Sequence, residues 1–203
     1  MTYIPSSMPQ PGIDQAIEMA ERLGFASVVV NMDGQFYTSH VPVHIARDES
    51  GQFQGLRFHV AKRNPLATRL QGGPEALIIF RGPDGYISPD WYDHENVPTW
   101  DYAFVHMTGP TVALSTESLR DHVKELLHQF DPQLVIREGY IDTYLSWIQG
   151  FAIPAPTVEP VFKLSQDKNQ VSVDRILAEL RRRGQWLDQE LADEIERQYK
   201  PHD

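Results

Sequence analysis

The fold class follows from residues 25–61, FASVVVNMDGQFYTSHVPVHIARDESGQFQGLRFHVA. Phe25–Met32 and Gln35–Ile45 are rich in β-branched and aromatic residues, and the Asp33-Gly34 pair between them is typical of a tight hairpin turn. A second turn, DESG, leads into Phe53–Ala61, another predicted strand. Closely spaced strands with tight turns indicate a closed antiparallel barrel.

Later segments extend the sheet and add helices. Further strand-forming runs bring the predicted total to about seven strands. These runs are Ala76–Arg81, Tyr86–Ser88, Thr99–Thr108 and Thr111–Leu114, and Gly82–Gly85 is predicted as the turn between the first two. Apolar residues at helical spacing predict helices at 13–23, 119–130, 141–151, 173–183 and 187–199, the second of them behind the cap candidates Ser115 and Thr116. The order of strands first, with helices inserted and appended, is that of an α+β domain.

Charge and composition exclude several classes of protein. The 203 residues include 18 Lys and Arg against 28 Asp and Glu, which gives a formal net charge of −10. DNA is a possible partner, but this negative charge does not support DNA binding. There is no cysteine, which excludes disulfide scaffolds and thiol catalysis and fits a reducing cytoplasm. No apolar run reaches the roughly 18 residues of a membrane span, and the first residues do not resemble a signal peptide. We therefore expect a cytoplasmic protein without a membrane partner.

Alternation along Phe53–Ala61 separates a core face from a polar face. Leu56, Phe58 and Val60 form the apolar set. Arg57 and His59 are expected to look outward, toward solvent, a ligand or another subunit.

A basic triplet, Lys62, Arg63 and Asn64, follows at the end of this strand, just before Pro65 and a predicted helical turn. Two cations, an amide donor and free backbone N–H groups can together bind a phosphate. A solvated basic turn is the simpler explanation of the triplet taken alone.

Aromatic residues gather between residues 86 and 104. They are Tyr86, Trp91, Tyr92, Trp100, Tyr102 and Phe104. Such rings can form core packing, a flat-walled site for a planar ring system, or a subunit interface. Ser88, Thr99 and Asp101 lie among them and could hydrogen-bond to the edges of a bound ring.

Histidines offer a weaker signal. The sequence has no HExxH motif, and His40 and His44 on one strand would lie about 13 Å apart, too far to share an ion. We predict no metal site, although a haem- or metal-handling barrel using His40, His59 or His106 remains an alternative. The sequence also lacks GxGxxG, P-loop and GxSxG motifs, so no catalytic residue is predicted.

Five stretches together resemble the PaiB-type FMN-binding family, which is described as a family of negative transcriptional regulators. They run in family order and read TSHVP (38–42), LRFHVAKRNP (56–65), FRGPDGYISPDWY (80–92), VPTWDYAFVHMTG (97–109) and KLSQ (163–166). Two positions depart from the family pattern, Phe58 where a glycine is usual and Asp167-Lys168 where Asn and Arg are usual.

The resemblance implies an antiparallel split β-barrel with inserted and C-terminal helices, related to pyridoxamine-phosphate oxidases. It implies an FMN-binding domain at 1–165, a helical tail at 166–203 packed on it, and a homodimer with FMN at the interface. The function implied is that of a negative transcriptional regulator or flavin redox sensor. An FMN-dependent oxidoreductase of unknown substrate is the alternative.

The resemblance also implies a set of FMN-binding residues. The phosphate is expected at Arg57, Lys62, Arg63 and Asn64. The ribityl chain and ring edge are expected at His40, Pro42, His59, Ala61 and Ser88. The ring would be enclosed, in part by the partner chain, by Trp91, Tyr92, Thr99 and Trp100.

Overall fold

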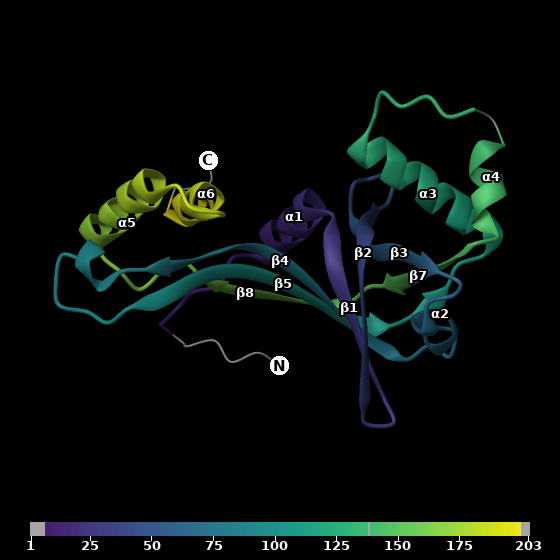
Figure 1. Cartoon of the computed structure of the whole chain (residues 1–203), viewed down its shortest axis with the longest axis horizontal. Coiled ribbons are helices and arrows are strands. Elements are labelled where there is room, and N and C mark those ends of the chain that lie inside the picture. The colour runs from purple at the N-terminus through teal and green to yellow at the C-terminus, as the bar shows by residue number, and fades with distance from the viewer. Residues whose placement is uncertain (1–6, 138, 200–203) are drawn as a thin grey trace. The chain divides into compact units, whose positions relative to one another are not determined.

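The computed structural model describes residues 7–137 and 139–199 (Figure 1). Within these residues lie six α-helices, one short 3₁₀ helix and eight strands. The helices are α1 (Ile13–Leu23), α2 (Pro65–Leu70), η1 (Pro89–Trp91), α3 (Thr116–Phe130), α4 (Tyr140–Leu145), α5 (Gln170–Arg183) and α6 (Asp188–Tyr199). The strands are β1 (Phe25–Met32), β2 (Gln35–Arg47), β3 (Phe53–Ala61), β4 (Glu75–Ile87), β5 (Thr99–Pro110), β6 (Val112–Ala113), β7 (Ile148–Pro154) and β8 (Thr157–Lys163).

The eight strands form one sheet in the order β6-β7-β3-β2-β1-β4-β5-β8. The pairs β1–β2, β1–β4, β2–β3, β3–β7 and β6–β7 are antiparallel, as predicted. In the part of the chain that the structure describes, β6 and β8 are the two edges of this order. The expected closed barrel was therefore wrong, because the edge strands pair on one side only.

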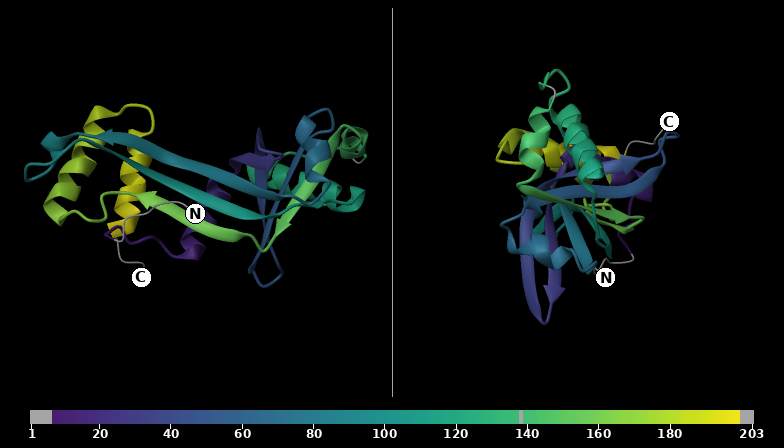
Figure 2. Two further views of the ribbon diagram at one scale, coloured as in Figure 1. Left: turned by 90° about the horizontal axis from the view of Figure 1, so that it is seen from below. Right: turned by 90° about the vertical axis from the view of Figure 1, so that its right-hand side faces the viewer.

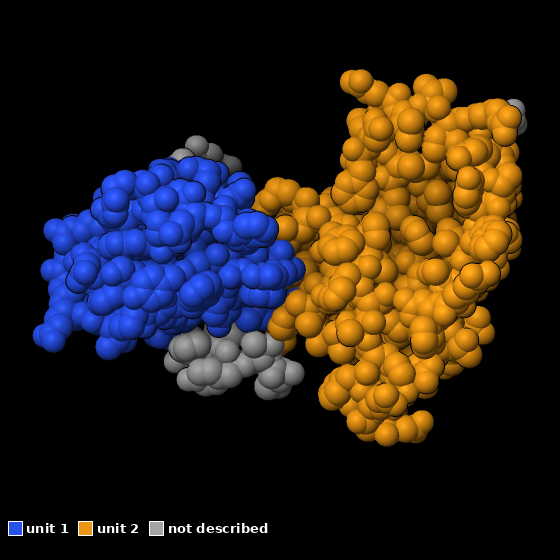
Figure 3. Space-filling model, in the orientation of Figure 1, with its two compact units in different colours: residues 1–16, 81–105, 160–203 blue, residues 17–80, 106–159 orange. Residues whose placement is uncertain are grey.

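Two compact units share the chain (Figure 3). Unit 1 takes in residues 1–16, 81–105 and 160–203, and unit 2 takes in residues 17–80 and 106–159. The C-terminal helices α5 and α6 thus belong to the same unit as residues 81–105. The division after residue 165 that the family resemblance implied stays a prediction.

Unit 2 is built around the three strands first recognised in the sequence. Asp33 and Gly34 both have positive φ, 53° and 77°, and join β1 to β2 as the predicted hairpin turn. Val43, Phe58 and Phe151 contribute to a core that is closed to solvent. Helices α3 and α4 lie beside β2, β3 and β7 (Figure 1), and α3 begins at the predicted cap Ser115, whose hydroxyl accepts from the N–H of Ser118.

Unit 1 holds the helical pair α5 and α6, which pack side by side (Figure 2). Asn169 caps the start of α5, and Gly184 ends it with a left-handed φ of 58°. A bidentate ion pair between Arg183 and the buried Asp188, at 2.7 and 2.5 Å, ties the end of α5 to the start of α6. The two predicted C-terminal helices are confirmed.

Two predicted boundaries were wrong. Gly82–Gly85 is not a turn, because β4 runs through it and Gly85 lies against Leu191 and Asp188 in unit 1. The helix predicted over 141–151 stops at Leu145, because Ile148–Pro154 pairs with residues 55–61 of β3 as β7. Ladder hydrogen bonds to a neighbouring strand override the helical spacing of that short segment.

None of the helices in the described ranges has both the length and the apolar character needed to cross a membrane.

Candidate functional site

The polar face of β3 is covered in unit 2 by helix α3. Leu56, Phe58 and Val60 are buried as predicted. The Arg57 Nη1 atom donates to both carboxylate oxygens of Glu125, at 2.9 and 3.2 Å. The outward orientation expected for this face was wrong, because α3 supplies partners for it. Arg57 is engaged by a carboxylate, and its role at the phosphate stays a prediction.

His59, the second residue of this face, faces His122 of α3. Its Nδ1 lies 3.1 Å from Nε2 of the fully buried His122, and His44 on β2 places its Nδ1 3.2 Å from Glu125 Oε2. Burial lowers the pKa of His122 to about 3 and also lowers the pKa of His59 and His44. All three imidazoles are therefore neutral at neutral pH.

The basic triplet forms an exposed turn between β3 and α2. The N–H of Asn64 donates to the carbonyl of Ala61, and its side chain caps α2 by accepting from the N–H of Leu66. The Asn64 amide also donates to Ser39 Oγ at 2.9 Å, which joins the turn to β2. These bonds fix the backbone that carries Lys62 and Arg63.

The two cations of this turn are exposed and have no carboxylate partner in the part of the chain that the structure describes. Across residues 7–137 and 139–199, Lys62 and Arg63 form no ion pair, and the Arg63 guanidinium lies 5.8 Å from the centre of the exposed Trp147 ring. Two uncompensated positive charges on a braced turn suit an anion such as the FMN phosphate. The donor set of this turn therefore fits the phosphate end of FMN.

Other predicted ring contacts lie on the same unit. His40 is exposed on β2, with Nδ1 2.8 Å from Ser27 Oγ. Pro42 is half-buried two residues further along β2, and Ala61 is exposed at the last position of β3. The structure thus groups His40, Pro42, Ala61 and the basic triplet on β2, β3 and the turn that follows.

The predicted residues on unit 1 have separate surroundings. Ser88 caps the short helix η1. The Arg183 guanidinium lies 5.0 Å from the Trp91 ring, while Trp100 donates from Nε1 to Asp84 and meets Tyr86 edge-on. Trp91 and Trp100 thus have different partners, and their enclosure of a bound ring stays a prediction.

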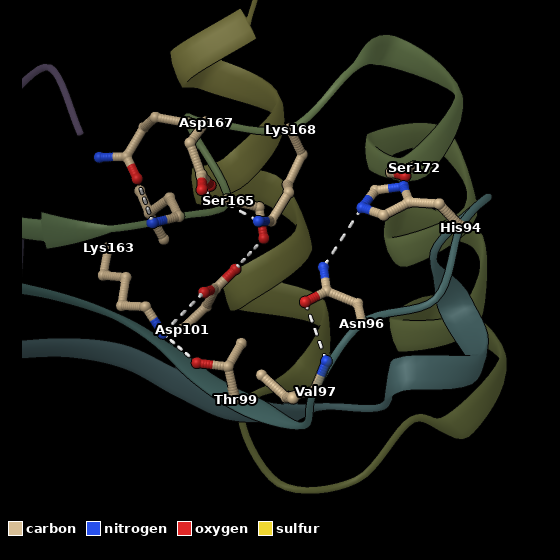
Figure 4. A network of polar contacts seen from close by, with 12 residues as sticks. His94, Asn96, Val97, Thr99, Asp101, Lys163, Ser165, Asp167, Lys168 and Ser172 are labelled. Atoms are coloured by element: carbon tan, nitrogen blue, oxygen red, sulfur yellow. Dashed lines mark hydrogen bonds and ion pairs between the residues drawn. The ribbon is translucent and has the colours of Figure 1, made fainter. Parts of the chain in front are cut away.

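Tyr92 and Thr99 do share a cavity of about 170 Å³ within unit 1. Figure 4 shows the polar contacts around Thr99, Asp101 and Lys163. Lys163, from the KLSQ stretch, donates to the Thr99 hydroxyl and to the carbonyl of Trp100. Ser165 donates to Asp101 Oδ2 at 2.6 Å. The other lining residues are Met8, Asn96, Val97, Asp167 and Lys168.

Burial changes the acidity of two groups in this cavity. It raises the pKa of Asp101 to about 6, against the hydrogen bond from Ser165 and the charge of Lys163. Burial also raises the pKa of Tyr92 to about 12, with further contributions from Asp101 and Asp167. Asp101 can therefore take up a proton just below neutral pH.

The substitution Asp101→Asn is expected to remove a pH dependence of stability between about pH 4 and pH 6. The ordinary pKa of 3.8 is raised to about 6 in the folded chain, so in that interval the native state holds a proton that the unfolded state has lost. The wild-type free energy of unfolding then falls as pH rises through this interval, by up to ~3 kcal/mol relative to the variant, and levels off above it. Urea unfolding of both proteins across the pH series measures the difference. A constant difference between them at all pH values would contradict this assignment.

Sequence reasoning missed the pair His122 and Glu125, and it missed the contact between Lys163 and Asp101, which it had noted only as a possible partner of a bound ring. His122 and Glu125 lie three positions apart on α3, and the only signal for them was a polar pair on a predicted amphipathic helix. Asp101 and Lys163 belong to stretches that were noticed for their family resemblance, but they are 62 positions apart and nothing local predicts that they meet.

Comparison with known proteins places the chain in a family. Residues 2–156 match the family described as "Putative FMN-binding domain". The chain belongs to this family. FMN is accordingly its cofactor, as the motif resemblance implied.

Relatives of this FMN-binding family member extend the comparison. It is 27% identical over 185 residues to the protease synthase and sporulation protein PAI 2 of Bacillus subtilis (strain 168), covering 88% of each chain. A FAD and haem binding protein from Mycobacterium smegmatis has a similar structure, with a TM-score of 0.56, 13% identity and coverage of 77% of this chain and 84% of that one. The conserved hypothetical protein Rv2991 from Mycobacterium tuberculosis has a TM-score of 0.57, 12% identity and coverage of 79% and 90%. The α+β fold with an antiparallel split β-barrel is confirmed.

Proposed function

We propose that this FMN-binding protein works as a homodimeric flavin redox sensor with a role in negative transcriptional control. The observation that carries the proposal is the braced, exposed turn at Lys62, Arg63 and Asn64, whose two cations have no carboxylate partner among the described residues. The similarity to PAI 2, a protein named for protease synthase and sporulation, supports a regulatory role rather than a metabolic one.

The residues of the chain have the task of binding and orienting the cofactor. When bound, FMN supplies reversible one- and two-electron redox chemistry. Lys62 and Arg63 hold the phosphate, and Asn64 keeps their turn in place through its bonds to Leu66 and Ser39. His40, Pro42 and Ala61, on the adjacent strands, border the ribityl chain and ring edge.

Exposed aromatic side chains on unit 2 support a second copy of the chain as the partner. Phe25, Phe36 and Trp147 are 56%, 71% and 60% exposed. Trp147 adjoins the basic turn, because the Arg63 guanidinium lies over its ring and its carbonyl accepts a hydrogen bond from the N–H of Lys62. Burying these rings would stabilise a dimer, and burying Trp147 beside the phosphate site would also shield the flavin.

A titration with FMN, followed by sedimentation of the purified protein, tests binding and assembly. Quenching of FMN fluorescence should saturate at one FMN per chain, and the loaded protein should sediment as two chains. Sedimentation as a single chain at saturating FMN would refute the dimer. Failure to quench FMN fluorescence would contradict binding itself.

The regulatory role needs a separate experiment, because the net charge of −10 opposes contact with DNA. Fluorescence anisotropy can measure binding to the DNA upstream of the protein's own gene, with the flavin oxidised or reduced by dithionite, over a salt series. Affinity should differ between the two redox states and fall with salt. Equal affinity in both states, or no binding at low salt, would favour the alternative of an FMN-dependent oxidoreductase.

A further inference from the structure

We propose that His44, His122 and Glu125 form a binding site in unit 2 for one divalent transition-metal ion of the zinc type. Each residue offers one ligand atom, and these atoms all lie within 4.8 Å of one another. Zn²⁺ binds imidazole nitrogen and carboxylate oxygen at about 2.0–2.2 Å, which places tetrahedral ligands roughly 3.3 Å apart. Closing the site therefore requires side-chain movements on the order of 1 Å.

Unpartnered nitrogens are the second observation that points to a ligand. His122 is completely buried, and its Nδ1 has no hydrogen-bond partner among residues 7–137 and 139–199. The buried Nδ1 of His44 also lacks one, because its 3.2 Å approach to Glu125 does not have hydrogen-bond geometry. Buried polar atoms nearly always have a partner, so two orphaned imidazole nitrogens beside one carboxylate call for an explanation. A shared cation would satisfy both nitrogens.

Contacts around these three residues match those that support metal ligands elsewhere. A metal-bound histidine donates its other ring N–H to a neighbour, and a metal-bound carboxylate accepts further hydrogen bonds. His59 Nδ1 lies 3.1 Å from His122 Nε2, so an Nε2–H on His122 leaves its Nδ1 lone pair for the ion. Arg57 in turn holds both oxygens of Glu125. His59 and Arg57 are thus positioning residues for the site.

The donor set selects the class of metal. Two imidazoles and one carboxylate suit Zn²⁺ and neighbouring late transition metals, whereas Ca²⁺ and Mg²⁺ prefer oxygen ligands throughout. Three protein ligands leave a fourth position for water. An ion here would join α3 to β2, because His122 and Glu125 lie on the helix and His44 lies on the strand.

Metal uptake by the full-length protein tests the site directly. Chelator-treated wild-type protein should take up one Zn²⁺ per chain in competition with a chromophoric chelator, and Co²⁺ should give the visible bands of a nitrogen- and oxygen-ligated ion. His44→Ala and Glu125→Gln should each weaken Zn²⁺ binding at least ~10-fold and remove the Co²⁺ bands. These two positions are only partly buried, so both variants should fold, which thermal unfolding without metal verifies.

His128→Ala is the matched control, because His128 is an exposed histidine on the same helix. It should bind Zn²⁺ as the wild type does, and Zn²⁺ should raise the melting temperature of both proteins but not of the His44 and Glu125 variants. The proposal is overturned if the wild-type chain takes up no stoichiometric Zn²⁺. It is equally overturned if the His44 and Glu125 variants bind Zn²⁺ with wild-type affinity. Neither result depends on FMN.

Discussion

The double substitution Lys62→Ala with Arg63→Ala is expected to weaken FMN binding by roughly 100-fold. A charge-assisted hydrogen bond contributes about 1.5–3 kcal/mol, and two exposed cations act at the low end of that range, so about 3 kcal/mol is lost. The effect should shrink as salt rises, because both side chains are exposed to solvent and screened by ions. Titration of FMN fluorescence at low and moderate salt measures both effects.

Lys124→Ala with Arg137→Ala removes the same charge from another exposed part of unit 2 and serves as the control. This control pair should keep wild-type affinity for FMN. If the Lys62 and Arg63 variant also keeps it, the phosphate is bound elsewhere in the chain. A wild-type protein that binds no FMN would instead contradict cofactor binding as such, so the two failures are distinguishable.

Gly55→Ala is expected to destabilise the protein by on the order of 3–5 kcal/mol. Gly55 has a φ of 128°, which L-residues rarely adopt, and an added Cβ would lie 2.3 Å from the carbonyl oxygen of Ile153 and 3.0 Å from Cα of Pro154. Backbone strain contributes about 1–3 kcal/mol, and overpacking against a paired strand adds a similar amount. A shift of the urea midpoint at unchanged slope would measure the loss.

Gly51→Ala separates the two contributions to this loss. Gly51 has a φ of 82°, but an added Cβ there would meet nothing within 4 Å. This variant should therefore carry the strain alone and lose only about 1–3 kcal/mol. Equal losses in the Gly51 and Gly55 variants would show that the contact with β7 contributes nothing.

The sequence predicted the central strands well, because the residues that determine them are neighbours in the sequence. The Asp33-Gly34 turn, the alternation of β3 and the Ser115 cap all depend on residues adjacent in sequence, and all three are confirmed. Strand β7 was missed, because its conformation depends on pairing with β3, about 90 positions earlier. Long-range pairing of this kind has no local signature.

The candidate site was likewise predicted only where the residues concerned are neighbours in the sequence. The basic triplet could be located from the sequence, since the strand end, the cations and the proline lie side by side. The engagement of Arg57 by Glu125 could not, because 68 residues separate the two side chains. The aromatic cluster between residues 86 and 104 was also noticed, but the sequence could not predict the different partners of Trp91 and Trp100.

The chain passes between its two compact units four times, at residues 16–17, 80–81, 105–106 and 159–160. Neither unit is one continuous stretch, so during synthesis unit 2 lacks β7 until residue 154 has left the ribosome, and unit 1 lacks α5 and α6 until still later. The nascent chain therefore exposes the partner surfaces of β3 and η1 for most of its translation, a period in which unpaired strands are open to aggregation.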